Sequence, residues 1–191
     1  MASSNSRVRY VVWTGFMIAI AFVLMFLEIS LPFMPPYLKY DLGDFPALVT
    51  AFALGPAAGV AVELGKEFLF FISGRNPTLV GMAANMLAGV AWVVPAALLY
   101  RAWHTRTGAV ASLILGALVM NAVMFAANGL FLLRAYGIPP AAIHATLMTA
   151  ILPFNVVKVC LTSIVTFALY KRVRTVFHWQ PVAVRLQDEA R

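Results

Sequence analysis

The sequence predicts an all-α integral membrane protein with six transmembrane helices and both termini in the cytoplasm. The chain has 191 residues, of which 62% are hydrophobic and only 11% are charged, so water cannot be the only solvent that its surface meets. Several apolar runs are long enough to cross about 30 Å of hydrocarbon. Basic residues are also distributed unequally between the two sides of these runs. We expect residues 1–191 to form a single membrane domain.

The first helix is expected at about residues 9–31, because the apolar run from Val11 to Ile29 spans a bilayer and no small-residue cleavage site follows it. Asp44 before Phe45 and Pro46 is a good start for a short second helix, which forms a hairpin with the third and need not span the membrane fully. The remaining boundaries follow proline and glycine breaks. The later helices are expected at about residues 45–54, 57–73, 78–103, 108–134 and 144–176, with residues 177–191 as a cytoplasmic tail.

The basic residues set the expected orientation. If each segment crosses once, one side collects Arg7, Arg9, Arg101, Arg106, Lys171, Arg172, Arg174, Arg185 and Arg191, and the other has Lys39, Arg75 and Arg134. By the positive-inside rule, the richer side is cytoplasmic. The net charge of +7 is therefore read as a topology signal of a cell-membrane protein in contact with lipid, and no nucleic-acid partner is expected. The loop "LPFMPPYLKYDLGDFP", residues 31–46, then lies outside.

Polar residues within the apolar segments gather at one depth near the outer side. They are Asn85, Asn128, Asn155 and Lys158, from three different helices, and Glu63, Lys66 and Glu67 lie at a similar height. Polar groups inside a membrane are costly and mark functional sites. Amide side chains both donate and accept hydrogen bonds, so they match the edge of a flat heterocycle. An outward-opening pocket for an uncharged ring-shaped molecule is the hypothesis, and interhelical hydrogen bonds are the simpler alternative.

Two lysines have different alternatives. Lys66 and Glu63 are three residues apart on one helix, so a structural ion pair explains them as well as a ligand does. Lys158 has no acidic neighbour on its own helix and therefore needs water, another helix or a ligand. The loop around Lys39, Tyr40 and Asp41 is interpreted either as a lid over the pocket or as a plain connection.

Several function classes lack their motifs. "GVAVELGK" has five residues between its glycines where a phosphate-binding loop needs four, and Glu67 follows instead of Ser or Thr. No HExxH pair predicts a metal site, and no catalytic residue group is found. A binding protein without its own ATPase needs a docking surface. Gly15 and Ala19 in "GFMIA" have the small-xxx-small spacing that allows another helix to approach closely.

Four segments carry a resemblance to a known family. They are "IAIAFVLM", "LKYDLGDFPALVTAFALGPAAGVAVELGKEFL", "GAVASLILGALVMNAVMFAAN" and "ILPFNVVKVCLTSIVTFALYKRV". Together they resemble the substrate-binding S components of energy-coupling factor (ECF) vitamin transporters, and specifically the riboflavin-binding members. The resemblance covers about residues 15–172.

The resemblance implies a six-helix subunit that captures riboflavin from outside and carries no cofactor of its own. It implies ligand contacts by Asn128, Asn155 and Lys158 and by the loop residues Leu38, Lys39 and Tyr40; Asn85 is added from its depth in the membrane. It also implies that Gly15 and Ala19 meet a transmembrane coupling subunit (EcfT), which works with two ATPases.

The chain departs from the family pattern at two places. Met82 in "GMAAN" replaces an acid that the family often has, and Glu67 follows Lys66 where the family often has Asn. These departures leave open another vitamin or a flavin analogue as the ligand. A membrane scaffold without transport function is the third alternative.

Overall fold

The computed structural model describes residues 2–32, 34–35, 38–75 and 78–177, and almost all of its regular structure is helical. The helices are α1 (Ala2–Met25), α2 (Asp44–Leu54), α3 (Pro56–Ile72), α4 (Leu79–Ala102), α5 (Arg106–Ala127), α6 (Leu133–Ala135), α7 (Pro140–Thr146) and α8 (Leu152–Phe177). Two π-helical segments, η1 (Asn128–Leu132) and η2 (Leu147–Ile151), join α5 to α6 and α7 to α8 without a break. The described chain therefore has six continuous helical units.

Four of these units are long and apolar enough to cross a membrane: residues 7–25, 79–102, 106–135 and 140–169. The all-helical membrane class is thus confirmed. The other two units, α2 and α3, have 11 and 17 residues. At 1.5 Å per residue, α2 is only about 16 Å long, so the short second helix has the length that the sequence suggested. Six full-length spans are not seen among the described residues.

Helix boundaries agree with expectation to within three residues except in three places. The first helix begins at Ala2 instead of about residue 9. The first helix ends at Met25 instead of residue 31, because Ile29 and Ser30 form a short strand, β1, that pairs antiparallel with β2 (Lys39–Tyr40). The last unit begins four residues early, since Pro140 occupies the first turn of a helix, where its missing N–H costs nothing. Of the expected 177–191 tail, all but residue 177 lies outside the described residues.

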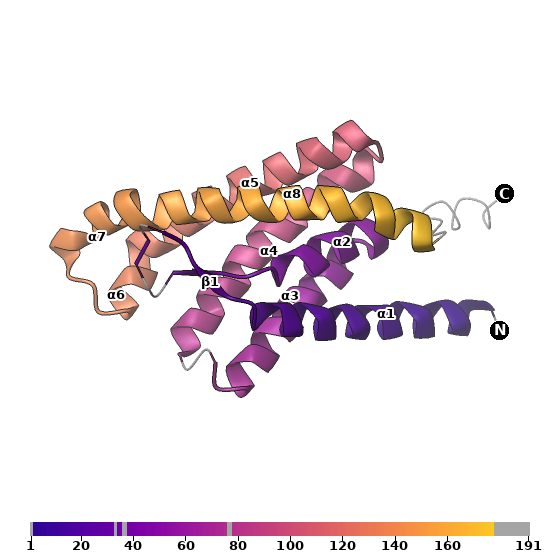
Figure 1. Ribbon diagram of the computed structural model, residues 1–191, viewed down its shortest axis with the longest axis horizontal. Coiled ribbons are helices and arrows are strands. Elements are labelled where there is room, and N and C mark those ends of the chain that lie inside the picture. The colour runs from indigo at the N-terminus through magenta and orange to yellow at the C-terminus, as the bar shows by residue number, and fades with distance from the viewer. Residues whose placement is uncertain (1, 33, 36–37, 76–77, 178–191) are drawn as a thin grey trace.

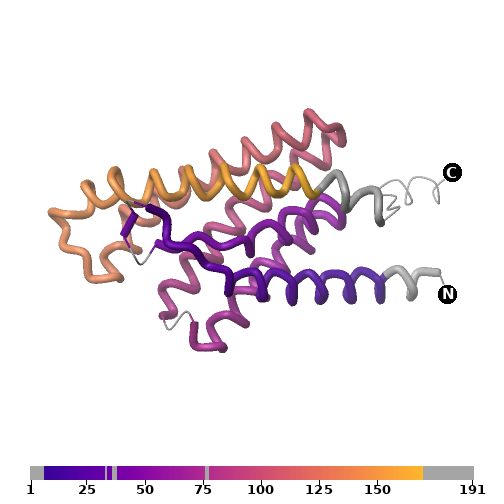
Figure 2. The backbone as a smooth tube through the Cα atoms, viewed as in Figure 1, coloured from indigo at the N-terminus to yellow at the C-terminus, as the bar shows by residue number. Residues whose placement is uncertain are grey.

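The first and the last described helices, α1 and α8, have their terminal ends on the same side of the helical bundle. The start of α1 and the end of α8 are on the right in Figure 1, and α6 and α7 form the opposite end. The connection from α1 to α2 runs towards α6 and α7 and then returns, as Figure 2 shows. This connection therefore covers the end of the bundle that lies away from the termini.

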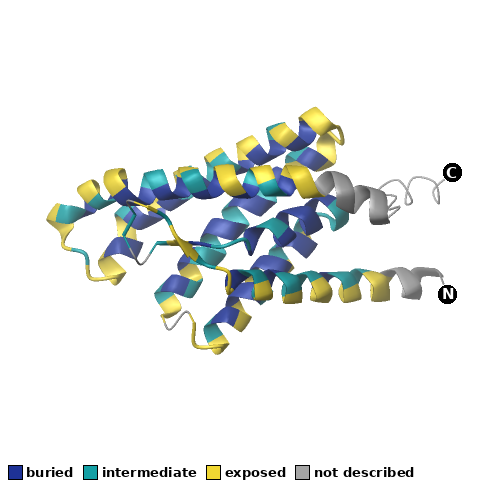
Figure 3. Ribbon diagram, viewed as in Figure 1, coloured by how far each residue is buried: buried dark blue, intermediate teal, exposed yellow. Residues whose placement is uncertain are grey.

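The core lies between α2, α3, α4 and α5. Trp92 on α4 is fully buried, and a Cβ at Gly116 on α5 would lie 2.6 Å from its carbonyl oxygen, so glycine lets these two helices approach closely. Gly55, with φ of 98°, turns the chain sharply between α2 and α3, a conformation that favours glycine. Exposed side chains lie on the outward faces of the long helices (Figure 3). In a membrane protein these faces meet lipid.

Candidate functional site

A cavity of about 470 Å³ lies at the end of the bundle away from the termini. Every one of the six helical units except α2 contributes to its wall, and so does the connection after α1. Its lining residues are Met25, Glu28, Leu38, Lys39, Asp41, Phe70, Arg75, Thr78, Gly81, Ala84, Asn85, Ala88, Met124, Asn128, Leu133, Tyr136, Ile138, Ile151, Phe154, Asn155 and Lys158. Small-molecule sites in proteins are apolar hollows of roughly 300–1,000 Å³ with a few placed polar groups. The cavity has this character.

The structure brings most of the predicted site residues together in this one wall. Leu38, Lys39, Asn85, Asn128, Asn155 and Lys158 all line the cavity. Tyr40 does not. Its side chain is buried, and its hydroxyl oxygen lies 3.2 Å from Oγ1 of Thr162 on α8. Tyr40 thus attaches the connection after α1 to α8, beside the cavity.

The three amide side chains are held by different elements. Asn85 on α4 donates from Nδ2 to Oε2 of Glu67, at 3.3 Å. Asn128, the first residue of η1, donates from Nδ2 to the carbonyl oxygen of Met124, at 2.8 Å. These bonds fix the orientation of each amide and leave its oxygen as an acceptor. Asn155 is 6% exposed and lies one turn before Lys158 on α8. The wall therefore offers a ligand several hydrogen-bonding groups, two of which are held in orientation by hydrogen bonds within the protein.

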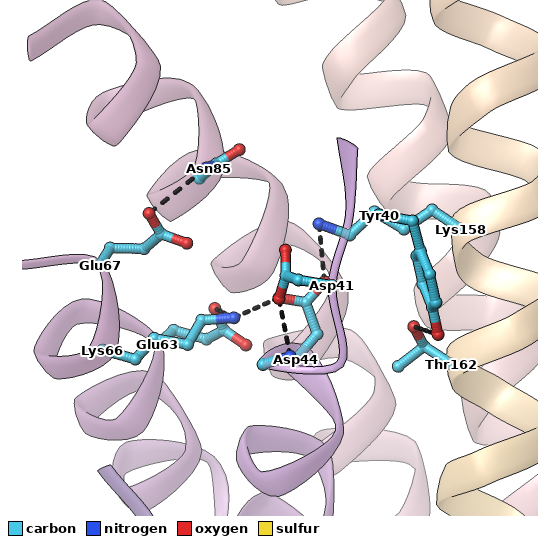
Figure 4. A network of polar contacts seen from close by, with 10 residues as sticks. Tyr40, Asp41, Asp44, Glu63, Lys66, Glu67, Asn85, Lys158 and Thr162 are labelled. Carbon is cyan, nitrogen blue, oxygen red and sulfur yellow. Dashed lines mark hydrogen bonds and ion pairs between the residues drawn. The ribbon is translucent and has the colours of Figure 1, made fainter. Parts of the chain in front are cut away.

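A buried network of charges, shown in Figure 4, joins Lys158 of this wall to charged residues of α2 and α3. Asp44 pairs through one carboxylate oxygen with Lys66 of α3, and its Oδ2 lies 2.9 Å from Nζ of Lys158. Nζ of Lys66 also lies 2.9 Å from Oε2 of Glu63, as expected for residues three apart on a helix. A Cβ at Gly89 would lie 2.1 Å from the same Glu63 oxygen, so glycine on α4 makes room for this carboxylate.

Asp44 was expected to start a helix, and the structure also makes it an ion-pair partner of two lysines. It is the first residue of α2, but the N-cap position is Gly43 and no side chain caps the helix. The Asp44 carboxylate is used by two lysines instead. For Lys158, the partner is thus a residue of another helix.

Within the described network, the carboxyl groups of Asp41, Asp44, Glu63 and Glu67 outnumber the ammonium groups of Lys66 and Lys158. Burial raises the pKa of Asp41 above its ordinary value, and the ammonium of Lys158 opposes this shift. Of these four carboxyl groups only Asp41 lines the cavity, where the other charged residues are Glu28, Lys39, Arg75 and Lys158.

The connection after α1 forms one side of the cavity. Lys39 and Glu28, which both line it, form an ion pair with 2.5 Å between Nζ and Oε1. The β1–β2 ladder pairs Ser30 with Lys39 and so holds these two side chains near each other. Further along, Oδ1 of Asp41 accepts a hydrogen bond from the Gly43 nitrogen at 2.7 Å. The described residues Glu28, Leu38, Lys39 and Asp41 of this connection therefore form part of the cavity wall.

Several residues that shape the site were not among the predicted ones. Glu28, Arg75 and Tyr136 line the cavity, and Thr162 holds Tyr40. Thr162 had a usable signal, because it follows Asn155 and Lys158 on one face of α8 at helical spacing. The others lie at helix ends and in connections, where no period predicts direction.

Gly15 and Ala19 are both exposed on α1, and a Cβ at Gly15 would have no atom within 4 Å.

Among the residues that the structure describes, no group of three or more His, Cys, Asp or Glu side chains has the geometry of a metal site.

The fold and the cavity together define a class: a helical membrane protein that holds a small molecule among its helices. The comparison with known proteins specifies the family. Residues 9–170 match the substrate-specific component of ECF transporters, and the chain belongs to this family. It is the substrate-binding subunit of an ECF-type transporter and not an enzyme.

Two relatives have assigned functions. Riboflavin transporter FmnP of Bacillus subtilis (strain 168) is 32% identical over 177 residues, which cover 88% of this chain and 93% of the relative. Riboflavin transporter RibU of Staphylococcus aureus (strain TCH60) is 34% identical over 161 residues, which cover 81% of this chain and 85% of the relative.

Two solved structures are similar. One is the S component of a bacterial ECF transporter, with a TM-score of 0.77 at 34% identity over 89% of this chain and 98% of the other. ThiT from Listeria monocytogenes has a TM-score of 0.66 at 20% identity over 91% of this chain and 99% of its own. At that identity, the likeness to ThiT concerns the fold alone.

Proposed function

We propose that this subunit captures riboflavin from the outer side of the cell membrane. The observation that carries the proposal is the single cavity wall that unites Asn85, Asn128, Asn155 and Lys158 with the loop residues Leu38 and Lys39. An uncharged tricyclic ring with alternating N–H and C=O groups suits oriented amides and apolar neighbours such as Phe154. The names of the two relatives support the same ligand.

The proposed orientation follows from charge. The ends of α1 and α8 lie together, away from the cavity (Figure 1), and the basic residues of the sequence gather on the side of the termini. With that side in the cytoplasm, the cavity opens outward. Riboflavin is then a transported substrate and not a resident cofactor.

Inward delivery is proposed to need partner subunits: a transmembrane coupling protein of the EcfT type and two ATPases. Membership of the ECF family supports an association of this kind. The exposed, unfilled face of α1 at Gly15 and Ala19 supports this helix as the docking surface, because small residues allow a second helix to approach closely.

The test is titration of riboflavin into the purified, detergent-solubilised protein, with the quenching of flavin fluorescence as the signal. We expect saturable quenching, and we expect Asn155→Ala and Lys158→Ala each to weaken binding by about 10-fold or more, the cost of a lost buried hydrogen bond or charge contact. Unchanged affinity in both variants would show that riboflavin does not bind in this cavity.

Another vitamin or a flavin analogue remains the second candidate, and competition separates it from riboflavin. Any ligand that binds only the folded protein raises its thermal stability. A protein stabilised by a different vitamin, and not by riboflavin, would reassign the substrate and keep the family. A protein that no tested vitamin stabilises would favour the scaffold alternative.

A further inference from the structure

We propose that Asp44 is the positioning residue for Lys158: it holds the Lys158 ammonium at the cavity wall and is needed for full ligand affinity, although it does not line the cavity. This inference rests on the proposed function, since it concerns the affinity for the flavin. It adds a residue that neither the sequence pattern nor the cavity wall identifies.

The geometry gives Asp44 a bridging place between three helices. It is the first residue of α2, it pairs with Lys66 of α3, and its Oδ2 lies 2.9 Å from Nζ of Lys158 on α8. The Asp44 and Lys158 side chains are 6% and 10% exposed. Lys158 lines the cavity, whereas Asp44 lies behind it. The carboxylate therefore reaches the ligand only through the lysine.

A lysine side chain has four rotatable carbon bonds and loses much rotamer freedom when its ammonium is fixed. An ammonium that is already fixed in the empty protein does not lose that freedom again when the ligand binds. Asp44 provides this fixation, and it also removes the penalty for a bare charge in a buried site.

Asp44 is itself held in place from two sides. Lys66, fully buried, binds its other carboxylate oxygen. The turn before Asp44 is closed by the Gly43 nitrogen, which donates to Oδ1 of Asp41 at 2.7 Å. A Cβ at Gly43 would lie 2.6 Å from Cγ of Met25, so the turn is also packed tightly against α1. A rigidly held carboxylate can fix the direction of a flexible partner.

The experiment is a double-mutant cycle in riboflavin affinity, measured by fluorescence quenching on wild type, Asp44→Asn, Lys158→Gln and the double variant. If Asp44 acts through Lys158, Asp44→Asn alone weakens binding by about 10-fold, and the double variant binds within about twofold of Lys158→Gln alone. A wild-type affinity in Asp44→Asn, or losses that multiply in the double variant, would overturn the proposal.

One control variant, Glu63→Gln, separates positioning of Lys158 from simple destabilisation of the protein. Glu63→Gln removes a buried charge from the same network but leaves the Asp44–Lys158 pair, so it should lower the melting temperature and keep the affinity within about twofold. An equal loss of affinity in Glu63→Gln would contradict the specific role of Asp44. Glu63 does not line the cavity.

If Asp44→Asn does not fold, the charge-balanced variant Asp44→Asn with Lys66→Met takes its place in the cycle and is compared with wild type. A loss of about 10-fold is expected, and with Lys158→Gln added the affinity should stay within about twofold of Lys158→Gln alone; no loss, or losses that multiply, would overturn the proposal. The titration of wild type tests the proposed function separately. If wild type does not bind riboflavin, the proposed function is rejected, whatever the variants do.

Discussion

The neighbouring helices α1 and α3 differ in what they bury: α1 is mostly exposed, whereas α3 buries its charged residues. In α1, only 17% of the apolar window is buried, and the small residues Gly15 and Ala19 face outward. In α3, the charged residues Glu63, Lys66 and Glu67 are buried and the apolar Phe68 is 54% exposed. The contrast teaches that in this bundle polarity indicates the interior, because lipid is the apolar solvent. The small residues on the outside of α1 are the surface where we propose contact with the coupling subunit.

The largest effect on stability is expected from Lys66→Met, which removes the central lysine of the buried charge network on α3. Asp44 would keep only Lys158 as a partner, and Glu63 would lose its ion-pair partner while fully buried. Removal of one member of a buried pair costs about 3–5 kcal/mol. We expect a much lower melting temperature, or loss of monodisperse protein in size-exclusion chromatography.

The matched control is Phe68→Leu on the exposed face of the same helix, which should change the melting temperature little. If Lys66→Met and Phe68→Leu melt alike, the buried charges of α3 do not stabilise the fold and the contrast with α1 fails.

The next effect concerns the outside of α1. Leucine at Gly15 and Ala19 fills open space, so stability and riboflavin affinity of the isolated subunit should stay unchanged. Assembly with the coupling subunit should fall by 10-fold or more, because close helix contact needs small residues. Co-purification with the partner subunits and riboflavin uptake in cells measure it.

Phe16→Leu, also exposed on α1, is the control, since it adds no volume. Normal uptake by the Gly15→Leu, Ala19→Leu protein would exclude this face of α1 as the docking surface.

The smallest effect is expected from Glu28→Gln, in the connection that joins α1 to the cavity wall. The Lys39 and Glu28 side chains are 45% and 25% exposed, and such a pair contributes about 0–1 kcal/mol. The dissociation rate of riboflavin should therefore rise by about fivefold at most. Stopped-flow recovery of flavin fluorescence measures it.

High salt should bring the wild-type rate towards that of the variant, because salt screens exposed pairs. A change of 100-fold would instead make this ion pair a main determinant of ligand retention.

The sequence could predict the helices and the depth of the polar residues, because both follow from composition and the rise per residue. It placed Asn85, Asn128, Asn155 and Lys158 at one level, and the structure places them around one cavity. The pairing of Asp44 with Lys158 was beyond it, since 114 residues separate them and helix packing decides the contact. The position of Tyr40 against Thr162 depends on the β1–β2 ladder, which only two residues of each strand form.

The two π-helical segments, η1 and η2, have a consequence for how homologous chains are compared. A π-helical turn holds one residue more than an α-helical turn, and one residue turns an α-helix by about 100°. In a relative with ordinary α-helix in place of η1, the residues equivalent to Leu133 and Tyr136 would point elsewhere unless the alignment carried a one-residue gap. Equivalence of ligand contacts must therefore be established separately before and after each wide turn.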